Sequence, residues 1–143
     1  DGSYASTMGS KLKGNVPLSQ DAVRAALGEP FRLPTIEEFK ELFNNIQYIN
    51  ASGTTITGTN KLTTVNGIVG LYIESTINGN RLFFPCSGLG HEQSWDERGL
   101  LGFYWSSSLY SDTYGLYLRF DSNYVDPQHT GNRYNGFPIR AVQ

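Results

Sequence analysis

The clearest structural signal in this chain is an amphipathic helix in its first third. In the segment FRLPTIEEFKELFNN, Thr35 and Glu38 have the spacing of a capping box, in which each side chain satisfies a main-chain N–H of the first helical turn. Apolar residues then recur at helical spacing, at Ile36, Phe39, Leu42 and Phe43. The sequence therefore predicts a helix that begins after Thr35 and buries one face.

A shorter helix is predicted just before it. Either Ser19 or Asp21 can cap a helix that runs through Ala26, and Gly28 and Pro30 end it. Residues 1–18 are rich in Gly, Ser and Lys and have no apolar periodicity. We expect them to form a flexible N-terminal segment, so that the folded domain comprises residues 19–143.

Strand and turn signals dominate the remainder of the chain. Two extended runs, residues 69–77 and 80–84, flank an Asn78-Gly79 dipeptide and predict a β-hairpin with a type I′ turn. Residues 88–102 form a polar loop bounded by glycines, and FPIRAVQ at residues 137–143 is predicted as a last strand. Helices early and short strands later, without a βαβ series, indicate one domain of the α+β class.

Charge and cysteine content exclude several partners and stabilising devices. The chain has 11 basic and 13 acidic residues without a run of either sign, so we expect neither a nucleic-acid partner nor an anionic membrane surface. No segment approaches the ~18 apolar residues of a membrane span, so direct membrane insertion is not expected. Cys86, the single cysteine, is predicted to be a buried structural thiol.

The C-terminal segment, residues 102–143, has an unusual outward chemistry. In GLYLRF, Leu116, Leu118 and Phe120 alternate with polar or amphipathic residues, which places the apolar set on a core face. The opposite set mixes tyrosine with charges of both signs, a composition typical of antibody-like binding surfaces. The segment also contains no Lys and no Glu. A Tyr- and Gly-rich β region can disfavour both residue types, so this absence alone leaves two explanations open.

Four ordered landmarks carry a family resemblance: residues 32–45 (RLPTIEEFKELFNN), 81–88 (RLFFPCSG), 102–108 (GFYWSSS) and 132–142 (NRYNGFPIRAV). Together they resemble the major paralogous domain family of Bacteroides-like gut and rumen bacteria. That family is similar to the formylglycine-generating-enzyme branch of the C-type-lectin-like fold. The resemblance extends from about Ser19 to the C-terminus and implies a C-type-lectin-like fold for this chain.

Within this fold the chain looks most like the variable proteins of diversity-generating retroelements, which occur in such bacteria and their phages. Their C-terminal segment is rewritten by adenine-directed mutagenesis that never yields Lys or Glu. The resemblance implies a scaffold set, namely Trp105, Ser106, Ser107, Leu116, Leu118, Phe120, Pro127, Gln128 and Arg140. It implies that the diversified, ligand-binding positions are Tyr110, Asp112, Thr113, Tyr114, Tyr117, Arg119, Asp121, Tyr124, Asp126, His129, Thr130, Tyr134 and Phe137.

Enzymatic activity is not expected. Formylglycine-generating enzymes use a cysteine pair, and this chain has only Cys86, so that oxidase activity is not carried over. Ser106–Ser108 with His129 lack a nucleophile-elbow motif, and His91-Glu92 lacks the spacing of a zinc-binding helix. Asp112, Asp121 and Asp126 do not form a dense calcium loop. We therefore expect no catalytic residue, no cofactor and no metal.

The sequence thus predicts a receptor-recognition or adhesin module, displayed outside the cell or on a cell or virion surface. Its partner is expected to be a macromolecular ligand, protein or glycan, with Tyr114, Tyr117, Arg119 and Tyr124 as energetic centres. Two alternatives remain open at this level: a structural module of a surface or pilus-tip assembly, and a carbohydrate-binding lectin. The oligomeric state stays open.

Overall fold

The computed structural model describes residues 14–91 and 94–143 and combines helices with antiparallel sheets. Its α+β class agrees with the sequence prediction. In chain order the elements are β1 (Gly14–Asn15), the 3-10 helix η1 (Leu18–Gln20), α2 (Ala22–Leu27), α3 (Ile36–Asn44), β2 (Ile46–Tyr48), β3 (Leu62–Val65), β4 (Ile68–Ser75), β5 (Arg81–Pro85), β6 (Leu89–His91), β7 (Ser94–Asp96), β8 (Gly102–Leu109), β9 (Tyr114–Phe120) and β10 (Val125–Asn132).

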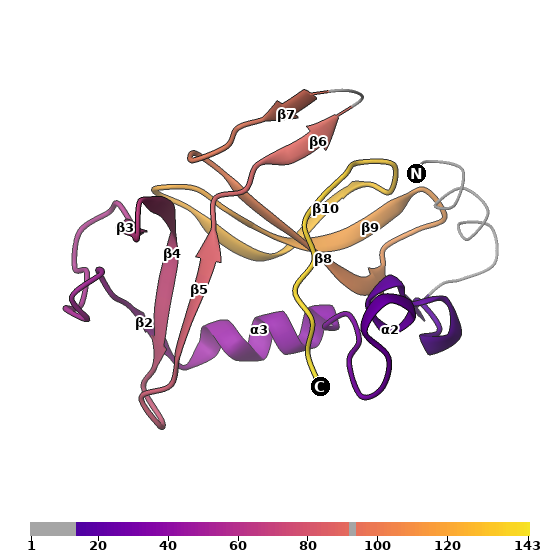
Figure 1. Cartoon of the computed structure of the whole chain (residues 1–143), viewed down its shortest axis with the longest axis horizontal. Helices are drawn as coiled ribbons and strands as arrows, with labels where there is room; N and C mark the ends of the chain where they lie inside the picture. Colours follow the sequence, from indigo (N-terminus) through magenta and orange to yellow (C-terminus); the bar gives the residue numbers. More distant parts are fainter. Residues whose placement is uncertain (1–13, 92–93) are drawn as a thin grey trace.

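Three antiparallel sheets organise these strands. The first has the order β1-β8-β9-β10. The second is built on β4, which pairs with β2 and β3 along one edge and with β5 along the other. The third is the β6–β7 hairpin. In Figure 1, α3 lies below the first sheet and the β6–β7 hairpin lies above it, so the two faces of that sheet have different covers.

The predicted helix α3 begins as expected. Thr35 Oγ1 accepts a hydrogen bond from the Glu38 N–H, and the Glu38 carboxylate accepts one from the Thr35 N–H at 2.8 Å, which completes the capping box. The Arg32 guanidinium pairs with the same carboxylate through two bonds of 2.6 and 2.8 Å. The hydrogen bonds from Arg32 are the main reason why the pKa of Glu38 falls to about 2.

Asp21, one of the two capping candidates, starts α2. Its Oδ1 accepts hydrogen bonds from the Val23 and Arg24 N–H groups, and its Oδ2 accepts one from the Leu33 N–H at 2.8 Å. The side chain is almost fully buried. This one carboxylate therefore caps α2 and also ties the helix to the strand-like segment before α3.

The expected boundary of the N-terminal segment needs correction. Residues 1–13 lie outside the described residues, but Gly14 and Asn15 pair with Leu109 and Ser108 as strand β1. The Val16 N–H continues this pairing by donating to the Ser107 carbonyl at 2.8 Å. Residues 14–18 are thus part of the folded domain, because the edge of β8 offers them main-chain partners.

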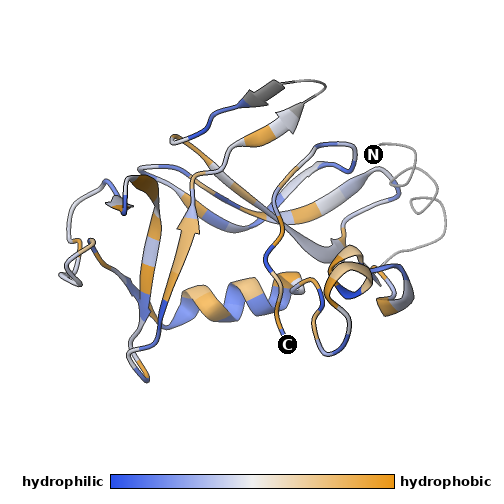
Figure 2. Cartoon of the chain, viewed as in Figure 1, coloured by the Kyte–Doolittle hydropathy of each residue, from blue (hydrophilic) through white to orange (hydrophobic). Residues whose placement is uncertain are grey.

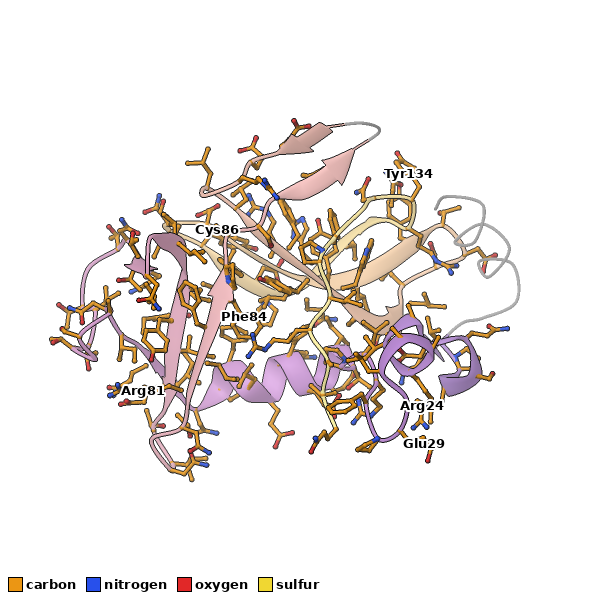
Figure 3. The ribbon with its side chains drawn as sticks, viewed as in Figure 1. Arg24, Glu29, Arg81, Phe84, Cys86 and Tyr134 are labelled. Atoms are coloured by element: carbon orange, nitrogen blue, oxygen red, sulfur yellow. The ribbon has the colours of Figure 1, made fainter. Side chains whose placement is uncertain are left out.

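The main core lies between α3 and the first two sheets. Aromatic rings from both sheets meet there: Phe84 packs edge-on against Tyr104 and Phe120, with ring centroids 5.3 and 6.5 Å apart. Figure 2 shows that α3, β4 and β5 are rich in apolar residues, and several of these residues belong to this core. Figure 3 shows Phe84 and Cys86 within it. Cys86 is buried, as predicted, and burial raises the pKa of its thiol to about 11.

The predicted β4–β5 hairpin is present, but its turn differs from the expected type. The loop comprises residues 76–79, closed by hydrogen bonds from the Ser75 N–H to the Asn80 carbonyl and from the Gly79 N–H to the Ser75 carbonyl. Of the predicted turn pair only Gly79 has a positive φ, +73°, whereas a type I′ turn needs two. Asn66 and Gly67 supply that pair instead, at +51° and +79°, between β3 and β4.

The predicted C-terminal strand is wrong. Residues 137–143 form no strand, and the end of the chain is held by an isolated bridge between Arg32 and Val142. Arg140 fixes the same segment, because its guanidinium donates to the Phe83 carbonyl at 3.0 Å and lies over the Phe84 ring. Within the described residues, no helix is long and apolar enough to span a membrane.

Candidate recognition surface

The face of β8, β9 and β10 that points away from α3 carries a second, smaller aromatic core. Phe103, Tyr117 and Phe137 are buried there, with Leu89, Leu101 and Trp105 packed around them. Phe137 lies at its centre: its ring centroid is 4.6 Å from those of Trp105 and Tyr117, and it stacks on Phe103 at 4.9 Å. The segment after β10 therefore covers this face.

Two predicted ligand-contact residues are consequently not on the surface. Tyr117 is 6% exposed and Phe137 is 9% exposed. The alternation in β9 correctly separates Tyr117 from Leu116 and Leu118, but it carries no information about residues that come from elsewhere to cover the second face. The ring of Tyr117 is packed between Trp105, Phe137 and His129.

Close packing of this face depends on two glycines. A Cβ built on Gly115 would lie 2.7 Å from the Trp105 ring, and one built on Gly131 would lie 2.7 Å from the Tyr117 ring. Both glycines are paired with each other across β9 and β10. Because each glycine has no side chain, one aromatic ring can occupy the space that a Cβ would fill.

Five predicted site residues gather at the end of this face, around the turn from β9 to β10. They are Arg119, Asp121, Tyr124, Asp126 and His129, and we call them the β9–β10 group. The Asp121 carboxylate accepts hydrogen bonds from the Asn123 and Tyr124 N–H groups, which holds the turn. It also lies 3.3 Å from the Arg119 guanidinium, which in turn lies 5.5 Å from the centroid of the Tyr124 ring.

Asp126 connects the remaining members of the β9–β10 group. Its Oδ2 accepts a hydrogen bond from the Tyr124 hydroxyl at 3.2 Å and lies 2.8 Å from His129 Nδ1. Its Oδ1 accepts the Gln128 N–H at 2.9 Å. Burial acts to raise the pKa of Asp126, but these hydrogen bonds outweigh it and the pKa is lowered. The hydrogen bond that the Tyr124 hydroxyl donates to the Asp126 carboxylate raises the pKa of Tyr124.

A second set of predicted residues lies at the opposite end of β9. Tyr110, Asp112, Thr113, Tyr114 and Tyr134 surround the turn from β8 to β9 and the end of β10, and we call them the β8–β9 group. Ser111 Oγ accepts the Thr113 and Tyr114 N–H groups. Tyr110 and Tyr134 are 69% and 63% exposed. Figure 3 shows Tyr134 pointing away from the body of the domain.

The two groups do not form one patch. Tyr114 begins β9 and Phe120 ends it, so the turns at its ends are separated by about 20 Å at the usual rise of a strand. They also differ in face: Arg119 lies on the second face with Tyr117, whereas Tyr114 shares the side of β9 on which Leu116 faces α3. Thr130 pairs with Leu116 and so lies on that side too. Thr130 is exposed and lies between the groups along β10.

Sequence reasoning missed Arg133, which joins the β8–β9 group to the end of β10. Its N–H donates to the Thr113 carbonyl and its Nη1 to the Asp112 carbonyl, both at 3.1 Å. An arginine in a polar turn gives no sequence signal that separates such a linking role from simple exposure. Trp105, which the resemblance assigns to the scaffold, packs against the smaller aromatic core. Its indole Nε1–H donates a hydrogen bond to the Asn135 carbonyl.

The serines considered for catalysis are engaged in main-chain contacts. Ser106 Oγ donates to the Leu116 carbonyl at 2.7 Å, and Ser108 Oγ accepts the Ile36 N–H and donates to Asn15 Oδ1. His129 contacts Asp126 and Tyr117 instead. No group of three His, Cys, Asp or Glu side chains suited to a metal ion occurs in residues 14–91 and 94–143, and the His91 side chain and Glu92 lie outside that description.

Comparison of the chain with family models, curated proteins and solved structures finds no match in any of the three.

Proposed function

We propose that this chain is a ligand-binding module on a C-type-lectin-like scaffold, of the kind that diversity-generating retroelements vary, and that it recognises a macromolecular ligand. Binding, rather than catalysis, is the proposed role. The α+β element order, with helices early and antiparallel strands later, supports the proposal at the level of fold class. Extracellular or virion-surface display is part of the same proposal.

The observation that carries the proposal is how burial divides the C-terminal segment. Five members of its expected scaffold set are buried, namely Ser106, Ser107, Leu116, Leu118 and Phe120. Trp105, Pro127 and Arg140 are half-buried, and Gln128 is the exposed exception. The expected diversified positions are exposed or half-exposed, except for Tyr117 and Phe137. Several of them lie in the turn from β8 to β9, whose main chain is fixed by hydrogen bonds to Ser111, a residue outside the diversified set. The turn from β9 to β10 is held by Asp121, which is itself one of the diversified positions. Side chains held on such a frame can change without changing the fold, which is what a variable binding surface requires.

The edge of the first sheet favours recognition by side chains over assembly by strand addition. β10 is an end strand, and its pairing is interrupted by a register shift between Asp126 and His129. Pro127 lies in this interruption and has no N–H to donate, and the Gln128 N–H is taken by the Asp126 side chain. A bulge with proline interrupts the continuous hydrogen-bonding edge that a neighbouring strand would need.

A display experiment tests the proposal. The exposed members of the β8–β9 and β9–β10 groups, with Thr130, are randomised with the codons that adenine mutagenesis yields, and the library is displayed on phage and panned against streptavidin. A matched control library randomises Leu116, Leu118 and Phe120. We expect protease-resistant, streptavidin-binding clones only from the first library. Equal loss of protease resistance in both libraries would contradict the proposal.

The retroelement part of the proposal has its own test in the DNA beside the coding region. We expect a near-copy of the last third of the gene, with adenines at the codons of the exposed positions, next to a reverse transcriptase gene. Adenine differences concentrated instead at the codons of Leu116, Leu118 and Phe120 would contradict it.

A further inference from the structure

A cavity separate from the β9–β10 group lies between the N-terminal elements and β8. Its volume is about 170 Å³, and it is bordered by residues before α2, by β8 and by the segment after β10. The lining is mainly apolar and includes Val16, Ala22, Leu33, Trp105, Leu109 and Ile139. An apolar cavity of about 150 Å³ in another protein holds a benzene ring, so the space suits one ring or one branched alkyl group.

One charged side chain, Arg133, also lines this cavity. In the part of the chain that the structure describes, no carboxylate oxygen lies within 4.0 Å of its guanidinium, although Arg24, Arg32, Arg81 and Arg119 all have such partners. Its Nη1 donates to the Asp112 carbonyl, which uses one of five N–H donors. Burial lowers the pKa of Arg133, while the Asp112 carboxylate acts to raise it.

The two serine hydroxyls of the cavity wall are already engaged, and the third polar residue there, Gln20, has a partner of its own. Ser106 Oγ donates to the Leu116 carbonyl, and Ser108 Oγ contacts Ile36 and Asn15. A ligand that only filled the apolar space would leave the partly buried guanidinium without a carboxylate in direct contact. A carboxylate accepts two parallel N–H bonds from a guanidinium, and such pairs are among the strongest hydrogen bonds in proteins.

We propose that this cavity binds a carboxylate that carries an apolar group of about one ring or one branched alkyl chain. The apolar group occupies the space beside Trp105 and Leu109, and the carboxylate pairs with Arg133. Two sources share this chemistry: a small aryl or alkyl carboxylate, and the C-terminal residue of a polypeptide. The site is distinct from the proposed variable surface, because no member of the β8–β9 or β9–β10 group lines it. The β8–β9 group contacts Arg133 through main-chain carbonyls, those of Asp112 and Thr113.

The test uses 3-phenylpropanoate and N-acetyl-leucine as probes, with their uncharged amides as matched controls. Binding to the full chain is followed by calorimetry and by the NMR shift of the Trp105 indole N–H. We expect the acids to bind about tenfold or more tightly than the amides, because only the acids pair with the guanidinium. A hexapeptide that ends in leucine, compared with N-acetyl-leucine, distinguishes the sources: tighter binding of the peptide identifies a polypeptide terminus, and equal binding identifies a small carboxylate.

Two substitutions test the two halves of the site. Arg133→Met should abolish the preference for acid over amide, and Ala22→Phe should fill the cavity and weaken both acids about tenfold or more while leaving the NMR spectrum folded. Arg81→Met is the matched control, because it removes a charge from β5, outside both the cavity and the proposed variable positions, and should leave probe binding unchanged. Equal binding of acid and amide, unchanged binding to the Ala22→Phe variant, or no binding at about 20 mM acid overturns the proposal.

Discussion

The two faces of strand β9 pack against different parts of the chain, one along its whole length and the other only in part. On one side Leu116, Leu118 and Phe120 face α3 and the second sheet, in a core that joins most elements of the domain. On the other side Tyr117 is covered by Phe103, Trp105 and Phe137, and the cover ends where Arg119 begins the β9–β10 group. The second face is thus part core and part surface within one strand.

This difference shows what determines whether a residue on β9 is available to a ligand. Alternation along the strand decides which residues share a face, whereas the path of the segment after β10 decides how much of the second face stays open. Phe137 closes over Tyr117, whereas Arg119 lies beside the Tyr124 ring and keeps 25% of its side chain exposed.

Truncation on the main-core face should be the most damaging change. Phe120 is fully buried and packs against Phe84 and Tyr104. We expect Phe120→Ala to lower the free energy of unfolding by about 3–5 kcal/mol, from lost burial and the cavity left behind. Urea unfolding measures this effect. Tyr124→Ala is the control on the exposed turn and should stay within about 0.5 kcal/mol of the parent chain.

Tyr117 distinguishes a core role from a ligand-contact role. Because its ring lies among Trp105, Phe137 and His129, Tyr117→Ala should lower the free energy of unfolding by about 2–4 kcal/mol. Tyr117→Phe keeps the ring and should cost much less. Both values come from the same urea unfolding experiment. A Tyr117→Ala chain as stable as the parent would show that the second face is open and that the sequence-based assignment was right.

The glycines of the second face should resist even one added methyl group. Gly131→Ala places a Cβ against the Tyr117 ring, and we expect a loss of about 1–2 kcal/mol from overpacking. Gly58→Ala is the matched control: nothing lies within 4 Å of its added Cβ, so it should be neutral or stabilising by about 0.5 kcal/mol. Equal thermal stability of the two variants would contradict the close packing described for this face.

Low pH should lower the free energy of unfolding by protonating Glu38, which caps α3 on the main-core side of β9. The folded-state pKa of about 2 lies below the ordinary value of 4.5, so the stabilisation is complete above about pH 4.5 and is lost as the pH falls through 2. The Glu38 side chain is 39% exposed, so solvent screening limits the effect to about 1 kcal/mol. We expect Glu38→Gln to be less stable than the parent at pH 6 and equally stable near pH 2. A stability difference that stays constant with pH would contradict this.

Local sequence chemistry accounts for much of this fold. The capping box at Thr35 and Glu38 predicts the start of α3, and Asp21 is one of two caps that the sequence offers for α2. The alternation of apolar and polar residues along β9 predicts that Leu116, Leu118 and Phe120 face the main core. Each of these features depends on residues within a few positions of one another, so no knowledge of the rest of the chain is needed.

The remaining features depend on contacts between distant segments. The sequence does not reveal that Phe137 lies over Tyr117, or that the Arg32 main chain bridges to Val142 and leaves the last residues without a strand. The turn at Asn78-Gly79 failed as a prediction for another reason: the β4–β5 register closes at Ser75 and Asn80, which makes the loop longer than two residues. The Asn66-Gly67 dipeptide is equally favourable and forms the two-residue turn.

If the division of β9 is right, the exposed C-terminal positions can change while the domain keeps its fold. A composite variant with Tyr110, Asp112, Thr113, Tyr114, Thr130 and Tyr134 all replaced by serine tests it by urea unfolding, beside a second variant with only Tyr117 and Phe137 replaced by serine. We predict that the six-residue variant stays within about 1 kcal/mol of the parent chain and that the two-residue variant loses about 4 kcal/mol or more. A six-residue variant that loses as much stability as the two-residue variant would contradict the claim.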